Sequence, residues 1–315
     1  MSLDSLLGQT FGDFELIVSD DCSTDETRDI CLEFASRDPR IKYFRNLKNL
    51  GMPGNLNAAI KRARGNYIAN LHDGDIFRSD LIEKWKWALD SIPEAPFVFN
   101  AYETMEPDRS RKLWQEPFGF RVPGELIAQH YFRTVSCCVW GTVMARASAY
   151  ARVGLFDPDF GFISDVDMWL RLAYGATVAY IREPLITLRK REPNHPWNHN
   201  VWQPLFWSFA IYARHLPKYI GQVSIYERSW YCETFRRRAI RGMLSLVKHK
   251  RWDRVQEGLA MWRDADDRVL RVTGRILGQS SWCPDWYDSR CWTRIRFPEV
   301  DSQPQYVPAA VERDR

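Results

Sequence analysis

Two carboxylates that follow a short apolar segment, Asp73 and Asp75, are the side chains of this sequence best placed to do chemistry. Residues 67–71 before them are apolar and β-prone, which predicts a buried strand ending just before the acids. Divalent cations prefer oxygen ligands, and Gly74 between the acids lets the backbone turn so that both carboxylates can face one ion. An Asp-Gly-Asp run is equally typical of a solvated turn, so the pair alone leaves both interpretations open.

The segments that must position these acids alternate between strand and helix. Strands are predicted at residues 14–18, 41–44, 67–71 and 97–100, and helices at 23–36, 79–91 and around Asn57. This alternation is typical of βαβ units, so we predict an α/β fold with a mostly parallel sheet flanked by helices. A second acidic pair, Asp20 and Asp21, also follows a strand, and ligands of such sheets bind at the carboxyl ends of strands.

A third acidic run, Ser164-Asp165-Val166-Asp167, precedes a helix with apolar positions such as Trp169 and Leu172. Acids at a helix amino terminus often only cap the exposed N–H groups. A carboxylate held there in a cleft can equally act as a general base, so the run leaves both roles open. Around it we predict loops and short elements covering a site at residues 103–133, a helix at 147–153, and strands at 139–145, 178–181 and 185–188.

The composition is that of a globular protein with an ordinary charge balance. Hydrophobic residues make up 45% of the 315 residues, and the net charge of +4 is too small to indicate nucleic-acid binding. The seven cysteines form no Cys-x-x-Cys, which favours reduced thiols over a disulfide scaffold or zinc ribbon. Acids near the amino terminus and the lack of a long apolar run argue against a secretory signal or a membrane span. We therefore predict a cytoplasmic protein.

The C-terminal part of the chain has a different character. Residues 201–298 have apolar positions at helical spacing, and the charged, proline-containing tail at 299–315 is predicted to be disordered. Between residues 226 and 255, nine basic residues face only three acidic ones. A basic amphipathic helix of this kind either contacts an anionic membrane at the inner face or is a solvated face that packs on the domain.

A set of short motifs runs through the first two thirds of the chain. Its members are Ser5-Leu6-Leu7-Gly8-Gln9-Thr10, the acidic run 20–27, Asn49-x-Gly51, Asn57, Gly65-x-Tyr67-Ile68, His72-Asp73-Gly74-Asp75, Gly154-Leu155-Phe156-Asp157 and Ser164-Asp165-Val166-Asp167. In this order and spacing they resemble family 2 glycosyltransferases of the GT-A fold. The resemblance covers residues 2–188, so we expect a Rossmann-like GT-A domain over residues 1–200.

The resemblance implies a role for each matching residue. Asp21 would contact the nucleotide base, Asn57 would border the nucleotide pocket, and Asp73 would bind the ribose. Asp75, together with Asp73, would hold a divalent metal, Mn²⁺ or Mg²⁺, at the diphosphate. Asp165 would be the general base.

Other positions are less regular. His195 and His199 either add a metal or phosphate contact, as in some relatives, or are simply exposed. At the metal motif, His72 and Gly74 occupy positions that are usually acidic in the family. The chain also begins after the family's first strand and its Pro-x-Tyr-Asn-like turn, one wall of the nucleotide pocket, so we expect weaker nucleotide binding.

These parts predict an inverting glycosyltransferase that moves a sugar from a UDP- or dTDP-sugar to a hydroxyl of a saccharide or lipid-linked acceptor. Synthesis of a cell-surface polysaccharide or glycolipid is the expected setting. Exposed tryptophans could offer flat faces to sugar rings, although most aromatic side chains are core residues. The candidates are Trp114, Trp140, Trp197 and Trp202.

Two other functions are compatible with the same motifs. A non-catalytic remnant of the fold would serve as a binding or membrane-docking module, and retained metal-dependent nucleotide binding would argue against it. A sugar nucleotidyltransferase would also use acids and a metal on an α/β sheet. That class should carry a glycine-rich, basic loop near its amino terminus to hold a triphosphate, and the sequence has none.

Overall fold

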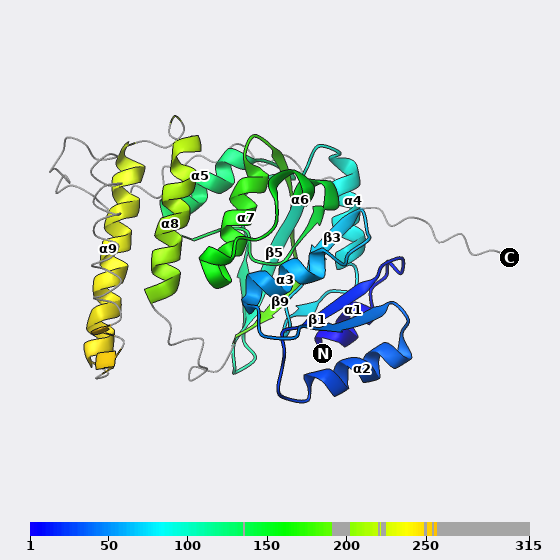
Figure 1. Ribbon diagram of the computed structural model, residues 1–315. Coiled ribbons are helices and arrows are strands. Elements are labelled where there is room, and N and C mark those ends of the chain that lie inside the picture. Colours follow the sequence, from blue (N-terminus) through cyan, green and yellow to red (C-terminus); the bar gives the residue numbers. More distant parts are fainter. Residues whose placement is uncertain are drawn as a thin grey trace.

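The computed structural model describes residues 1–134, 136–190, 202–219, 221, 225–248, 251–253 and 255–256 (Figure 1). Its strands are β1 (Leu16–Asp20), β2 (Ile41–Arg45), β3 (Tyr67–Asn70), β4 (Ile76–Phe77), β5 (Phe97–Met105), β6 (Arg111–Trp114), β7 (Arg121–Pro123), β8 (Val143–Arg146) and β9 (Thr177–Arg189). Its helices are α1 (Ser2–Leu7), α2 (Thr27–Arg37), α3 (Gly51–Ile60), α4 (Leu81–Ser91), α5 (Gly124–Thr134), α6 (Ala147–Val153), the 3-10 helix η1 (Pro158–Ile163), α7 (Ser164–Ala173), α8 (Trp202–Tyr219) and α9 (Ile225–Lys248).

The described strands form two separate sheets. β1 and β2 pair in parallel, with Leu16 opposite Ile41 and Asp20 opposite Arg45. The larger sheet has the order β3-β8-β5-β9-β4, and β6 and β7 are added to β5 and β9. Among the described pairs, β1 bonds to β2 alone and β3 to β8 alone, so no ladder of backbone hydrogen bonds joins the two sheets.

The α/β class with flanking helices is confirmed, and the larger sheet is mixed. β5 and β9 run parallel, whereas β8 runs antiparallel to both β3 and β5. Sequence patterns reveal strands but not their directions, so the predicted mostly parallel arrangement holds for only part of the sheet. The two strands predicted at residues 178–181 and 185–188 form a single strand, β9, which pairs with β5 across register shifts next to Ala101.

Strand β5 contributes side chains to a hydrophobic core on each face of the larger sheet, because successive side chains of a strand point to opposite faces. Phe97 and Phe99 pack with Tyr150 of α6 and Trp169 of α7 on one face. Val98 packs on the opposite face with Trp85 of α4. Burial of each such side chain contributes about 1.5–3 kcal/mol, so helices covering both faces hold the sheet in place.

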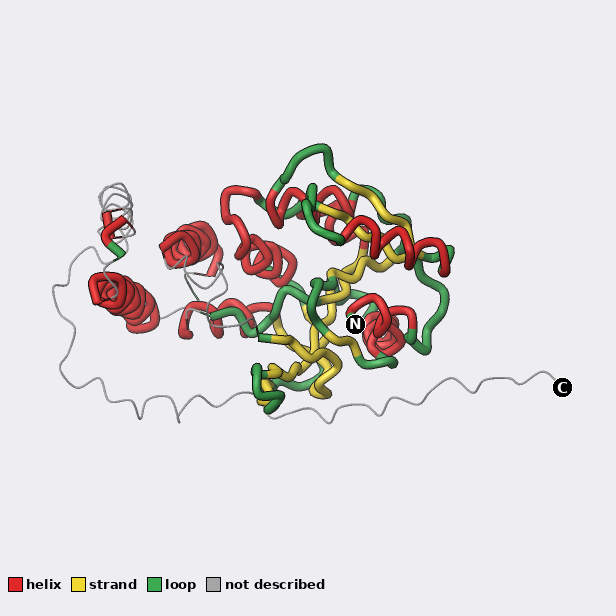
Figure 2. The backbone as a smooth tube through the Cα atoms, turned by 90° about the horizontal axis from the view of Figure 1, so that it is seen from below, coloured by secondary structure: helices red, strands yellow, loops and turns green. Residues whose placement is uncertain are grey.

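The C-terminal helices extend the molecule beyond the sheet. Figures 1 and 2 show α8 and α9 side by side at one end, next to α5 and α7. Tyr212 of α8 stacks on Tyr231 of α9 with ring centroids 3.8 Å apart. The described part of the region predicted to be helical is therefore helical, and the predicted tail at 299–315 lies outside the described residues. None of the described helices is long and apolar enough to span a bilayer.

One helix was absent from the sequence prediction. Residues 103–133 were expected to be irregular, yet they contain the end of β5, the short strands β6 and β7, and α5. The buried residues of α5 are Ile127, Ala128, Tyr131 and Phe132, a spacing typical of a helix with one apolar face. The polar residues between them hid this pattern.

Candidate active site

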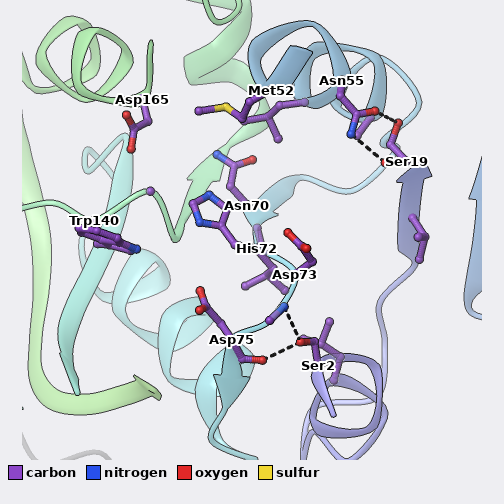
Figure 3. A pocket seen from close by; sticks show the side chains of 18 of the residues that line it. Ser2, Ser19, Met52, Asn55, Asn70, His72, Asp73, Asp75, Trp140 and Asp165 are labelled. Atoms are coloured by element: carbon purple, nitrogen blue, oxygen red, sulfur yellow. Dashed lines mark hydrogen bonds between the residues drawn. The ribbon is translucent and has the colours of Figure 1, made fainter. Parts of the chain in front are cut away.

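A cavity of about 3510 Å³ opens between the two sheets and collects most of the residues singled out in the sequence. Its walls come from β1, α3, β3, the segment 71–75, the segment 136–141 and the start of α7. Figure 3 shows Asp73 and Asp75 on one side of this space, Asp165 on the other, and His72 between them. Acids that lie far apart in the sequence thus meet around one space large enough for a ligand.

The segment 71–75 is fixed through its backbone. Gly74 has φ +86°, a conformation that side chains disfavour, and this explains the glycine between the two acids. The Ser2 hydroxyl accepts a hydrogen bond from Gly74 N at 3.0 Å and donates one to Asp75 O at 2.8 Å. Arg189 Nε donates to Gly74 O at 2.7 Å. The first helix and the last strand of the sheet therefore hold this turn between them.

Asp75 and Asp73 differ in their surroundings. Asp75 is 7% exposed, whereas Asp73 is exposed to solvent within the cavity. No group of three His, Cys, Asp or Glu side chains that could hold a metal occurs in the described residues. Mg²⁺ is commonly held by one or two carboxylates together with substrate phosphates, so this pair fits a cation whose other ligands arrive with a diphosphate.

The acids after β1 have separate tasks. Asp20 is buried and accepts hydrogen bonds from Ser23 N and the Tyr43 hydroxyl at 2.8 and 2.5 Å. Burial alone would raise the pKa of Asp20, but these hydrogen bonds hold it below its usual value. Asp21 accepts from Leu50 N at 2.8 Å and lines the cavity. Asp20 therefore stabilises the turn, and Asp21 is the acid that a ligand can reach.

The structure places Asn57 away from the cavity. Its amide donates to Phe156 O at 2.8 Å and accepts from Phe156 N at 2.9 Å, so both ends are engaged by one backbone. Asn55 lines the cavity instead, and its amide accepts from the Ser19 hydroxyl at 2.7 Å and donates to Ser19 O at 2.8 Å. Asn57 thus fastens α3 to the segment before η1, and Asn55 fastens it to β1.

Asp165 lies in the first turn of α7 and lines the cavity. Its Oδ1 accepts from Val166 N at 2.8 Å. Burial raises the pKa of Asp165 to about 7, and hydrogen bonds from the backbone only partly offset this. A carboxyl that is half ionised near neutral pH is suited to general-base catalysis, because it can both take and hold a proton.

Asp167, two residues further along α7, is fully buried and paired. It accepts hydrogen bonds from Arg171 Nε at 2.8 Å and His215 Nε2 at 2.9 Å, and Arg214 Nη1 lies 3.3 Å away. Burial alone would raise the pKa of Asp167, but the bond from His215 and the charge of Arg171 lower it below its usual value. Burial lowers the pKa of His215, although Asp167 opposes this. An ionised Asp167 therefore joins α7 to α8.

The residue pattern left the roles of the two acids of α7 open, whereas the resemblance assigned the general base to Asp165. Neither predicted the contact of Asp167 with His215. Helical spacing distinguishes neither a paired carboxylate from one facing a cavity nor the partner that a distant helix supplies. His195 and His199 lie outside the described residues, so their predicted contacts stay predictions.

A mixed α/β sheet flanked by helices, with carboxylates gathered around one cavity, matches the GT-A fold. The same fold is found in S. aureus TarS residues 1–349 in complex with UDP-GlcNAc. The TM-score is 0.54 at 17% identity, covering 84% of this chain and 87% of that chain. Residues 2–154 match the model for glycosyl transferase family 2.

Relatives by sequence carry the same designation. An uncharacterized glycosyltransferase of Rickettsia typhi is 27% identical over 190 residues, which are 60% of this chain and 58% of that protein. The putative teichuronic acid biosynthesis glycosyltransferase TuaG of Bacillus subtilis is 37% identical over 106 residues, 33% of this chain and 41% of TuaG. The chain thus spans less than two thirds of the length of these relatives. They support a transferase as the enzyme class.

We expect Asp167→Ala to lower the free energy of unfolding by about 3–5 kcal/mol, because it leaves a buried histidine and an arginine without their acid. Urea denaturation followed by circular dichroism measures the loss. Asp159→Ala, which removes an exposed acid from neighbouring η1, is the matched control and should change stability by less than about 0.5 kcal/mol. Equal stability of the two variants would contradict the role of Asp167.

We expect Asp165→Asn to stabilise the protein, and the gain should grow as pH rises. The pKa is about 7 in the folded state and 3.8 as the ordinary value, so ionisation costs the folded state nothing below about pH 4. The cost increases between these values and levels off above pH 7. Melting temperatures from pH 4 to 8 measure it, and a gain that is constant across this range would show that burial does not raise the pKa.

Proposed function

We propose that this chain transfers a sugar from a nucleotide-sugar to an acceptor hydroxyl with inversion of the anomeric centre. The observation that carries the proposal is that two acids line one cavity. One is the buried Asp75, and the other is Asp165, whose pKa of about 7 suits a base. A UDP- or dTDP-sugar is the proposed donor. In support, TarS is described in complexes with UDP-GlcNAc and with UDP.

The donor would lie along the cavity from β1 to the segment 71–75. Asp21 would contact the base and Asp73 the ribose. Asn55, which lines the cavity, would border the nucleotide pocket in place of Asn57. Asp75 and Asp73 would hold Mn²⁺ or Mg²⁺ at the diphosphate. When bound, such a cation offsets the negative charge that develops on the leaving group.

Asp165 would remove the proton of the acceptor hydroxyl as its oxygen bonds to the anomeric carbon. The bond from that carbon to the diphosphate breaks on the opposite side, and the electron pair leaves with the diphosphate. One displacement of this kind inverts the configuration. The desolvated surroundings that raise the pKa of Asp165 also make its carboxylate a stronger base.

The acceptor is proposed to be a saccharide or lipid-linked saccharide of a cell-surface polysaccharide or glycolipid. An E. coli relative is named UDP-Glc:alpha-D-GlcNAc-diphosphoundecaprenol beta-1,3-glucosyltransferase WfgD. It is 43% identical over 82 residues, 26% of this chain and 32% of WfgD. TuaG is named for teichuronic acid biosynthesis. Both names support an acceptor destined for the cell surface.

A lipid-linked acceptor suits a cytoplasmic protein bound to the inner face of the membrane. The described outer surface of α9 and the segment after it support this, because apolar and basic side chains are exposed together. The apolar ones are Leu244, Val247 and Trp252, and the basic ones are Arg237, Arg241 and Lys248. Apolar side chains insert at the headgroup boundary, and basic ones are attracted to anionic lipids.

We expect the wild-type chain to be stabilised by one of UDP, dTDP, GDP or CMP in the presence of Mn²⁺ and not without it. A ligand at a hundred times its dissociation constant adds about 2.7 kcal/mol to the stability, which a thermal-melt assay resolves. Asp75→Ala should abolish the shift because the cation loses its buried ligand. Asp80→Ala, an acid outside the cavity, is the control.

Turnover of the donor that this screen identifies then separates binding from chemistry. Asp165→Asn should keep the shift in melting temperature caused by the nucleotide but should no longer release nucleoside diphosphate from the donor. The wild-type rate should rise with pH through about 7 as the base ionises. A nucleotide shift with wild-type turnover in Asp165→Asn would disprove the assigned base. No shift with any nucleotide would instead favour a non-catalytic binding module.

We expect the chain to sediment with phosphatidylglycerol vesicles at low salt and to be released as salt rises, because charge attraction is screened. Arg241→Glu combined with Lys248→Glu should reduce binding. Lys86→Glu on α4, a half-exposed lysine paired with Asp90, is the control. Failure of the wild type to sediment would rule out the membrane contact.

A further inference from the structure

Trp140 exposes a large aromatic face beside the proposed base. Its side chain is 49% exposed and lines the cavity immediately before Gly141. Figure 3 shows Trp140 on the same side of the cavity as Asp165, with His72 between these residues and the two acids of the metal motif. A half-exposed tryptophan lacks part of the stabilisation that burial of its ring would give. A ligand with an apolar face can supply that burial when it binds at this wall of the cavity.

The ring of Trp140 is held by other aromatic side chains rather than left mobile. Tyr102 lies against it with ring centroids 5.7 Å apart. Tyr102 in turn stacks on Trp114 at 6.2 Å and an interplanar angle of 15°. The Trp114 indole N–H donates to Thr104 Oγ1 at 3.1 Å. Tyr102, Thr104 and Trp114 belong to the paired strands β5 and β6, so the aromatic side chains that support the Trp140 ring are fixed to the larger sheet.

Gly141 lets the His72 ring pack directly against the backbone beside Asp165. A Cβ at this position would lie 2.4 Å from His72 Cε1, 2.8 Å from His72 Nε2 and 3.1 Å from Asp165 Oδ2. His72 Nε2 and Asp165 Oδ2 are therefore less than about 6 Å apart. At that separation, one oxygen atom of a ligand in the cavity can lie within hydrogen-bonding distance of both.

We propose that Trp140, Gly141 and His72 form the acceptor subsite, which takes a saccharide as its ligand. A sugar ring stacks on Trp140, and its reacting hydroxyl lies between His72 Nε2 and Asp165 Oδ2. The proposal rests on the transfer reaction inferred above and names the residues that would bind its saccharide acceptor. It also gives a function to His72, which stands where the related motif usually has an acid.

The two polar side chains divide the work on the hydroxyl. The His72 ring N–H donates a hydrogen bond to the hydroxyl oxygen and directs its remaining lone pair at the anomeric carbon. Asp165 accepts the proton while the new carbon–oxygen bond forms and the bond to the diphosphate breaks. A glycine is required because the Cβ of any other residue at position 141 would collide with the His72 ring and displace it from Asp165.

Saturation-transfer NMR on the full chain with UDP and Mn²⁺ tests the subsite directly. The probes are methyl α- and β-glycosides of glucose, galactose, N-acetylglucosamine and rhamnose. We expect at least one to receive magnetisation through its ring C–H protons, and Trp140→Ala to weaken that binding about tenfold. Tyr174→Ala removes an aromatic ring that is 49% exposed outside the cavity and should leave saccharide binding unchanged.

Two further variants separate loss of fold from loss of the subsite. Gly141→Ala should lower the melting temperature and the saccharide affinity, because its Cβ collides with the His72 ring. Adding His72→Ala removes the ring, so the double variant should regain the melting temperature without regaining turnover. His72→Ala alone should keep nucleotide binding and lower kcat at least tenfold with a sugar acceptor, and His72→Gln should restore part of it.

The outcomes distinguish this proposal from the one it rests on. Binding of a nucleotide by the wild type with no saccharide of the panel overturns the subsite and leaves the transferase proposal standing. Wild-type saccharide affinity in Trp140→Ala, or wild-type kcat in His72→Ala, also overturns it. Saccharide binding that depends on Trp140 in a chain that binds no nucleotide supports the subsite and overturns the transferase.

Discussion

The site depends on one buried carboxylate that takes no part in the proposed chemistry. Asp167 accepts hydrogen bonds from Arg171 on its own helix and from His215 on α8. Arg171 also donates to Val153 O and Leu155 O at 2.8 and 2.9 Å, so the same network holds the segment that leads into η1. Because Asp165 lies two residues before this anchor, the start of α7 is fixed at the cavity wall. The stability that the ion pairs of Asp167 contribute offsets part of the free-energy cost of burying Asp165 without a cationic partner.

The two acids of α7 show how environment divides roles between identical side chains. Asp167 is surrounded by donors that keep its pKa low, whereas burial raises the pKa of Asp165 to about 7. Pairs of carboxyl groups whose pKa values are pushed apart in this way are typical of sites where one group handles protons and the other provides structure. The same division recurs at the end of β1, where Asp20 stabilises the turn and Asp21 lines the cavity.

Much of this organisation was predictable from the sequence, because it depends on local patterns. Apolar strands ending in acids predicted the α/β fold and the edge at which Asp21 and Asp75 lie, and an acidic run before a helix drew attention to Asp165. What depends on three-dimensional contacts was not predictable. Nothing local separates Asn57, which bonds to a distant backbone, from Asn55, which lines the cavity. Strand direction likewise follows from long-range pairing, so the mixed character of the larger sheet could not be read from periodicity.

The separation of the two sheets makes α3 the connection between the walls of the cavity. Asn55 fastens this helix to Ser19 of β1, and Asn57 fastens it to Phe156 in the segment before η1. The distance from β1 to the segment before η1 therefore depends on a helix that one asparagine anchors on each side, instead of on a continuous sheet. Substitutions in α3 that touch no ligand would then change the width of the cavity. They would alter the affinity for the proposed nucleotide as the loss of a contact residue would.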